Sequence, residues 1–284
     1  MISQTRLKIP KTLTTSPNTT KLNLKILDKV KYNVNAEASR VLGDSNSGQK
    51  PSMSTFNTIL FGYAIKNHNS KGAIEWFKKL DSFKLKPDLI SFNLVLNGLV
   101  YERDTIGAEE WFEKINKYGL EPDNVTYSAL IKLHGENKNI KLAVKFYNEM
   151  VSKGIKPDVK TYGIMISAYK NAEDYETALN VFQELKRTDL VLNNFIYHMM
   201  MDCMRKQGDL KGAVKLYKEM INGNIEADNS IYIVLLKIYN QVWTDRKMIN
   251  NETIQVCLNA ATKMGNRHAL ERLEKQIEKM KLII

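Results

Sequence analysis

The pattern of hydrophobic positions in this chain repeats about every 35 residues. In five successive segments an aromatic residue is followed by an alanine, by a second aromatic four residues later, and by an aliphatic residue three residues after that. The four columns are Phe56, Phe92, Tyr127, Tyr162 and Tyr197; Ala73, Ala108, Ala143, Ala178 and Ala213; Phe77, Phe112, Tyr147, Phe182 and Tyr217; and Leu80, Ile115, Met150, Leu185 and Met220. Steps of four and three place residues on one face of an α-helix, so the pattern predicts amphipathic helices.

Proline residues mark the limits of these segments. Pro51, Pro87, Pro122 and Pro157 are separated by 36, 35 and 35 residues, and the last three each precede an aspartate. Spacing this regular indicates an internal repeat. The units are 53–88, 89–123, 124–158, 159–193 and 194–228, with a partial sixth unit over 229–250.

Each unit is predicted to contain two helices joined by a short polar connection. The first helix begins after the proline and aspartate, because proline ends the preceding helix and aspartate can cap the next one. The second helix carries the alanine column, whose small side chain lets the two helices approach closely. A single hairpin cannot bury its apolar face, so neighbouring units must stack. The sequence therefore predicts an all-α solenoid, a superhelix of helical hairpin repeats of about 35 residues, with no β-sheet.

Two segments flank the predicted repeat array of 51–250. Residues 1–50 have no repeat signature and are rich in Thr, Ser, Asn and Lys, so we expect a basic, mostly disordered leader with a short helix near 21–32. Residues 251–284 carry Ala269, Leu273 and Ile277 between charged residues, which predicts a C-terminal capping hairpin.

The charge of the chain is unevenly distributed. The net charge is +11 from 42 basic and 31 acidic side chains, and residues 1–34 hold +6 of it. A basic balance permits a polyanionic partner such as nucleic acid. Because the repeat array itself is only mildly basic, the charge alone does not identify the partner.

The sequence does not indicate a catalytic or metal site. Cys203 and Cys257 are too few for a disulfide framework or a four-cysteine zinc site, and the histidines have no ligands at metal-binding spacing. Neither a Gly-rich phosphate loop nor a Gly-x-Ser-x-Gly motif occurs, and no apolar run reaches the roughly 18 residues of a membrane span. We therefore expect no metal, cofactor, small-molecule substrate, membrane insertion or enzymatic activity.

The third unit carries the most specific motifs. Residues 126–131 read Thr-Tyr-Ser-Ala-Leu-Ile, residues 143–150 read Ala-Val-Lys-Phe-Tyr-Asn-Glu-Met, and residues 153–158 read Lys-Gly-Ile-Lys-Pro-Asp. A helical hairpin of this form resembles the pentatricopeptide repeat, and the resemblance covers roughly residues 53–241. The tetratricopeptide repeat fits less well, because the chain lacks its Trp-Leu-Gly-Tyr signature.

The resemblance implies sequence-selective binding of single-stranded RNA, one base per repeat. In this family the fifth and the last residue of a repeat read the base. Asn with Asp favours uridine and Ser with Asp leans toward guanine, so the implied target begins 5′-U-U-G, whereas we interpret Gly163 and His198 as positions where recognition has lapsed. The implied pairs are Asn57 with Asp88, Asn93 with Asp123, Ser128 with Asp158, Gly163 with Asn193, and His198 with Asp228.

Neighbouring residues suggest further contacts with RNA. Because the fifth residue stands next to the aromatic column, we expect it to face away from the core, toward the surface of the first helices. Apolar residues in the second place of a unit could pack against base faces, and basic residues near the ends of first helices could meet phosphates. A simpler interpretation is that the amides are solvated helix residues and the aspartates are helix caps. The apolar residues are Ile90, Val125 and Phe195, and the basic residues are Lys66, Lys170, Arg205 and Lys206.

Two functions are compatible with these features. The first is an RNA-binding factor in organellar RNA processing, stability or translation. The second is a protein-interaction scaffold, such as a component of a mitochondrial ribosome or other complex, with little base reading. In either case we expect a protein partner or a larger ribonucleoprotein complex. The Ser/Thr-rich, basic and acid-poor N-terminus resembles an organellar presequence, which suggests the mitochondrial matrix; the alternative is a basic arm that contacts RNA.

Overall fold

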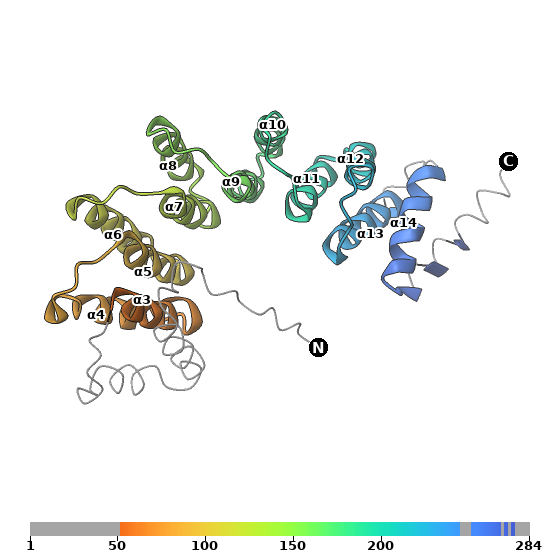
Figure 1. Ribbon diagram of the computed structural model, residues 1–284. Coiled ribbons are helices and arrows are strands. Elements are labelled where there is room, and N and C mark those ends of the chain that lie inside the picture. Colours follow the sequence, from red (N-terminus) through yellow and green to blue (C-terminus); the bar gives the residue numbers. More distant parts are fainter. Residues whose placement is uncertain (1–51, 245–250, 268–269, 272–273, 276–284) are drawn as a thin grey trace. The chain divides into compact units, whose positions relative to one another are not determined.

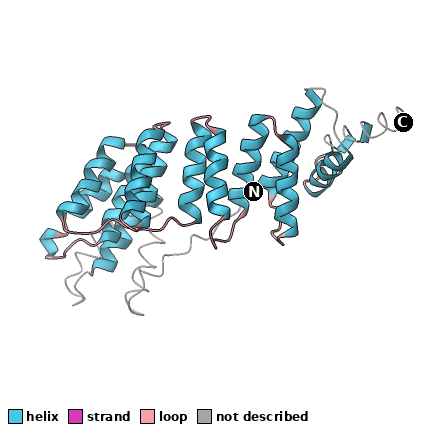
Figure 2. Ribbon diagram, turned by 90° about the horizontal axis from the view of Figure 1, so that it is seen from above, coloured by secondary structure: helices cyan, strands magenta, loops and turns pink. Residues whose placement is uncertain are grey.

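The computed structural model describes residues 52–244, 251–267, 270–271 and 274–275. Within these ranges every regular element is a helix and none is a strand (Figure 2). The predicted leader and much of the predicted capping hairpin lie outside the described residues. The elements are α3 (Met53–Phe61), η3 (Gly62–Lys66), α4 (Ser70–Lys78), η4 (Asp81–Phe83), α5 (Leu89–Glu102), α6 (Thr105–Lys117), α7 (Asn124–Glu136), α8 (Ile140–Ser152), α9 (Val159–Asn171), α10 (Tyr175–Lys186), α11 (Asn194–Gln207), α12 (Leu210–Asn222), α13 (Asn229–Thr244) and α14 (Asn251–Lys263).

The first helix of each unit begins where the repeat pattern predicts it. Helices α5, α7, α9 and α11 start directly after Asp88, Asp123, Asp158 and Asn193. Each of these side chains accepts a hydrogen bond from the backbone N–H three residues later, which satisfies one of the N–H groups left unpaired at a helix start. The prediction of two helices in each of the five units is confirmed.

The first repeat, 53–88, has one residue more than the others, and a π-helical turn accommodates it. Phe56 and Ala73 are 17 residues apart, whereas Phe92 and Ala108 are 16 apart. Between Phe56 and Ala73 lies η3, and the backbone N–H of Asn67 donates to the carbonyl oxygen of Gly62 five residues earlier at 3.1 Å. A π-turn holds one more residue than an α-turn, so the aromatic and alanine columns stay in register.

The chain forms two compact units. The first comprises the described residues up to 137 together with 145–155, and the second comprises 138–144 and the described residues from 156 onward. In the first compact unit α5 packs against α3 and α7, and α4 and α6 lie in a second row (Figure 1). In the second compact unit α11 packs against α9 and α13, with α10 and α12 in a second row (Figure 1).

Aromatic side chains join one hairpin to the next in the first unit. The ring of Phe77 on α4 meets Phe92 on α5 at a centroid distance of 4.8 Å, and Phe112 on α6 meets Tyr127 on α7 at 5.6 Å, both edge to face. Burial of one such side chain stabilises the fold by about 1.5–3 kcal/mol. All five alanines of the alanine column are fully buried, as the close approach of the two helices requires.

The second aromatic column is shifted in two units. Tyr147 and Tyr217 are only half-buried, whereas the preceding residues Phe146 and Leu216 are 5% and 4% exposed. Adjacent positions on a helix differ by about 100°, so both border a broad apolar face, and here the earlier position points further inward. The predicted role of Tyr147 and Tyr217 as core aromatics therefore applies only in part.

The described residues form neither a membrane span nor a cluster of metal ligands. No described helix has both the length and the apolar character needed to cross a membrane. Across the same residues, His, Cys, Asp and Glu side chains do not gather in threes as metal ligands would.

Replacement of Phe182 by alanine tests how much the second aromatic column stabilises the second compact unit. Phe182 is 1% exposed, and a large-to-small change in such a core costs about 3–5 kcal/mol. We expect a marked fall in melting temperature by circular dichroism. Val191→Ala is the control, because Val191 is 82% exposed and the change should cost less than about 0.5 kcal/mol. Equal effects of the two changes would contradict the assigned core.

Candidate nucleic-acid interface

In the first two repeats, 53–88 and 89–123, the fifth residue of the repeat contacts its last residue. The Asn57 amide nitrogen donates to both carboxylate oxygens of Asp88, at 3.3 and 3.1 Å. The Asn93 amide nitrogen donates to Asp123 Oδ1 at 3.1 Å. These residues meet because the first helices of neighbouring units pack side by side, which places the cap of the following helix beside the fifth residue of the preceding one.

The predicted exposure of the fifth residues is wrong. Asn57, Asn93 and Ser128 are only 2%, 8% and 3% exposed. The first helices pack so closely that the position beside the aromatic column is covered as well as the column itself. The interpretation of these amides as solvated helix residues is therefore also wrong, whereas the aspartates do act as helix caps.

The two asparagines differ in how their amide oxygens are satisfied. The Thr126 hydroxyl lies 2.7 Å from Asn93 Oδ1 and can donate to it. Ser91 is the third residue of the repeat that follows Asn57, as Thr126 is of the repeat that follows Asn93. The Ser91 hydroxyl, however, donates to the Asp88 carbonyl oxygen at 2.6 Å. Among the residues that the structure describes, Asn57 Oδ1 consequently has no hydrogen-bond partner, and it is buried. This role of the third residue was not among the predictions from the sequence, although a recurring Ser or Thr in that place was a visible signal.

Ser128 and Asp158 belong to different compact units. The Ser128 hydroxyl donates to Asn124 Oδ1 one turn earlier on α7, at 3.1 Å. Asp158 is exposed and accepts from the Thr161 backbone N–H at 2.7 Å, which makes it the cap of α9. The role of this pair in reading a base stays a prediction.

The fifth position of the fourth unit is covered by the unit that follows. A Cβ atom on Gly163 would lie 2.9 Å from Phe195 and 3.0 Å from Ile196, closer than ordinary van der Waals contact. The partner residue Asn193 is exposed and caps α11 through the Ile196 backbone N–H. Gly163 itself has no side chain to read a base, and the close approach of Phe195 and Ile196 leaves no room for one.

His198 is half-buried on α11. Burial lowers its pKa, and the positive charges of Lys170 and Lys237 lower it further, while Asp202 and Asp228 act in the opposite direction. The ring is therefore neutral near pH 7. Its predicted partner Asp228 is exposed and accepts from the backbone N–H groups of Ser230 and Ile231, at 2.9 and 3.2 Å.

The apolar residues in the second place differ in their exposure. Ile90 is half-buried, whereas Val125 and Phe195 are 47% and 51% exposed. Val125 and Phe195 therefore present apolar surface on the first helices α7 and α11, and the Phe195 ring lies close over Gly163.

Two of the basic residues expected to meet phosphates are held by a buried carboxylate. Lys170 Nζ lies 2.7 Å from Asp202 Oδ2, and an Arg205 guanidinium nitrogen lies 2.8 Å from Asp202 Oδ1. Arg205 also donates to the Gln241 side-chain oxygen at 3.1 Å, so the network reaches three successive first helices. A phosphate would have to compete with Asp202 for both cations. Asp202 was not among the predicted site residues, although an acid three residues before Arg205 was a usable signal.

Burial and ion pairing act in opposite directions on Asp202. Its exposed fraction is 6%, and burial alone would raise its pKa. Hydrogen bonds and positive charge from Lys170 and Arg205 outweigh burial and lower the pKa from 3.8 to about 2. The carboxylate is therefore ionised throughout the physiological pH range.

Family models match most of the repeat region. The PPR repeat family matches residues 87–135 and 122–171, the PPR repeat matches 160–190 and 195–225, and the pentatricopeptide repeat domain matches 43–100. Together these matches cover more than half of the chain. The chain belongs to the pentatricopeptide repeat family.

Solved pentatricopeptide repeat structures share the fold of this chain. The pentatricopeptide repeat protein PPR10 in complex with an 18-nucleotide psaJ RNA element is 17% identical, with a TM-score of 0.60 over 94% of this chain and 42% of that chain. PPR10 from maize is 17% identical, with a TM-score of 0.55 over 91% and 39% of the respective chains. The PPR domain of Arabidopsis thaliana protein-only RNase P 1, in complex with tRNA, is 16% identical, with a TM-score of 0.51 over 66% and 98%.

The comparisons confirm the all-α solenoid class of this pentatricopeptide repeat chain. The chain spans less than half the length of PPR10. No curated protein sequence matches it.

Asp202→Asn tests the network that ties the later pentatricopeptide repeats together. Because the folded-state pKa lies below the unfolded value, the carboxylate stabilises the fold above about pH 4, and this contribution is lost as the pH falls toward 2. The shift corresponds to about 2 kcal/mol at pH 7. We expect urea unfolding to show a loss of that order for Asp202→Asn, shrinking between pH 4 and pH 2. The exposed Asp189→Asn is the control, and a pH-independent loss for Asp202→Asn would contradict the assignment.

Proposed function

We propose that this pentatricopeptide repeat protein binds single-stranded RNA and is not an enzyme. The observation that carries the proposal is the pairing of Asn57 with Asp88 and of Asn93 with Asp123, because these are the residues that the family uses to read a base. The RNA bound in the PPR10 complex and the tRNA bound by the PPR domain of RNase P 1 support the same class of ligand.

The chemistry of the asparagine amide suits uridine. An amide offers an acceptor oxygen and two N–H donors, and one N–H of each asparagine is used by the aspartate. The second N–H and the amide oxygen complement a uridine carbonyl and its N3–H. Asn57 Oδ1, which has no hydrogen-bond partner, would accept the N3–H without giving up an existing bond. We therefore propose that the first two units favour uridine.

The expected affinity is low. Asn57 and Asn93 are buried, so a base reaches them only if the first helices separate or the side chains turn outward, and that rearrangement costs binding energy. Base contacts of about 1–3 kcal/mol each, summed over the first three repeats, give a binding free energy of roughly 3–9 kcal/mol before the cost of association. This corresponds to micromolar affinity or weaker, and it supports action within a larger ribonucleoprotein complex.

The second compact unit favours a scaffold role. Gly163 is covered by Phe195, and Lys170 and Arg205 are paired with Asp202, so this unit offers fewer groups for bases and phosphates. We propose that base reading is concentrated in the first three repeats and that the remaining repeats serve mainly in assembly. The complex acts in organellar RNA processing, stability or translation, in the mitochondrial matrix.

Filter binding on short single-stranded RNAs tests the proposed reading. Wild-type protein should prefer an oligonucleotide containing U-U-G over one with C-C-G, and Asn57→Ala with Asn93→Ala should abolish the preference. A loss of about 1–3 kcal/mol per base corresponds to roughly 5- to 150-fold for each position. Asn180→Ala, an exposed asparagine on α10, is the control. Absence of any selective binding at low salt would overturn the proposal.

The location can be tested separately. Residues 1–50 fused to a fluorescent reporter should direct it to the mitochondrial matrix, because the segment is basic and acid-poor. Replacing Arg6, Lys8 and Lys11 by glutamine should reduce import. A reporter that stays in the cytosol with the native segment would contradict the proposed location.

A further inference from the structure

A second surface of the first compact unit lies on the other row of helices from the asparagine–aspartate pairs. A groove of about 420 Å³ runs between α6 and the 145–149 part of α8. Its floor is formed by Phe112 and Phe146, and Ile106, 73% exposed, stands at its edge. The base-reading pairs come from α3 and α5 and from the N-terminal caps of α5 and α7, so RNA and a ligand in this groove would occupy different helices (Figure 1).

The groove is negatively charged although the protein is basic. Glu109, Glu110 and Glu113 of α6 line it, and Lys145 is the one cation that lines it among the described residues. Among the described residues, neither Glu110 nor Glu113 takes part in a salt bridge, and both are exposed. Glutamates at successive turns of one helix repel each other, so this arrangement is unfavourable without a cation nearby.

The fourth glutamate of the groove is already neutralised. Glu149 accepts a hydrogen bond from Lys153 at 2.8 Å and another from Tyr127 at 2.9 Å. Burial acts to raise the pKa of Glu149, but these donors outweigh it and lower the pKa. The uncompensated charge therefore lies on the α6 side of the groove.

His134 lies behind the groove without compensating its charge. Its ring is 1% exposed and stacks on Phe146 with centroids 5.4 Å apart. Nε2 lies 3.4 Å from Glu109 Oε1, yet neither ring nitrogen makes a hydrogen bond with any part of the chain that the structure describes. Burial lowers the pKa of His134 more than Glu109 raises it, so the ring is neutral near pH 7. The charge of Glu109 thus stays available to a ligand.

We propose that this groove binds a cationic segment of a partner protein, in which lysine or arginine residues flank an apolar side chain. The apolar side chain would lie on Phe112, Phe146 and Ile106, and the cations would pair with Glu109, Glu110 and Glu113. Single-stranded RNA is excluded from the groove by its own negative charge. The proposal goes beyond RNA binding and does not depend on it, since the groove uses none of the base-reading residues.

Fluorescence anisotropy with a defined peptide tests the proposal on the full chain. The probe is a labelled 12-residue peptide with arginines around one central leucine, and a peptide with glutamates in place of the arginines is its control. We expect the arginine peptide to bind, with affinity falling as salt rises from about 50 to about 200 mM. Glu110→Lys with Glu113→Lys should weaken binding at least roughly tenfold, and Ile106→Ser should weaken it several-fold.

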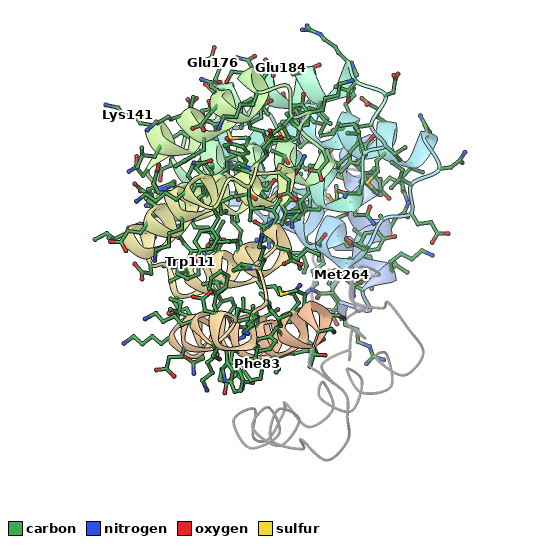
Figure 3. The ribbon with its side chains drawn as sticks, turned by 60° about the vertical axis from the view of Figure 1, so that its left-hand side comes forward. Phe83, Trp111, Lys141, Glu176, Glu184 and Met264 are labelled. Carbon is green, nitrogen blue, oxygen red and sulfur yellow. The ribbon has the colours of Figure 1, made fainter. Side chains whose placement is uncertain are left out.

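Glu176→Lys with Glu184→Lys provides the matched control. Both residues are exposed glutamates, here on α10 (Figure 3), so the control reverses the same charge on another second helix. Unchanged affinity in this variant, together with the loss in the α6 variant, would support the groove. Equal losses in the two variants would show diffuse charge attraction, and failure of the arginine peptide to bind at low salt would also overturn the proposal.

Discussion

Each helical hairpin of this chain has an apolar face that only a neighbouring hairpin can cover. The contacts of Phe77 with Phe92 and of Phe112 with Tyr127 show how this is done, with an aromatic ring of one second helix set against the first helix of the following unit. Because the same contact recurs, every unit must keep the same distance between its columns. The π-helical turn at Gly62–Lys66 illustrates the constraint, since it absorbs an extra residue and keeps Ala73 fully buried.

The same stacking creates the asparagine–aspartate pairs. A cap residue must stand at the start of each first helix, and side-by-side packing places that cap against the fifth residue of the preceding unit. Asp88 thus receives hydrogen bonds both from the Ser91 backbone N–H and from the Asn57 amide. One carboxylate serves helix capping and amide positioning together, so the groups proposed to read bases are held by the contacts that build the fold.

Charged groups divide the surface of the molecule by role. In the second compact unit the cations Lys170 and Arg205 pair with the buried Asp202. This network joins three successive first helices, and it removes two cations from phosphate binding. In the first unit Glu110 and Glu113 lack such partners among the residues that the structure describes, and they border an aromatic groove. This basic protein thereby carries, on helices other than those of the base-reading pairs, a surface that we propose is suited to a cation.

The periodicity of the sequence by itself determined the helical hairpins, their first-helix starts and the family, because these depend on local capping and on spacing along one helix. Tertiary structure decided the environment of the proposed site. The burial of Asn57, the donation from Thr126 to Asn93 and the covering of Gly163 by Phe195 all arise between units. The capture of Lys170 by Asp202 has the same origin. Such contacts join residues about 32 to 33 positions apart, and only the packing of one first helix on the next brings them within hydrogen-bonding distance.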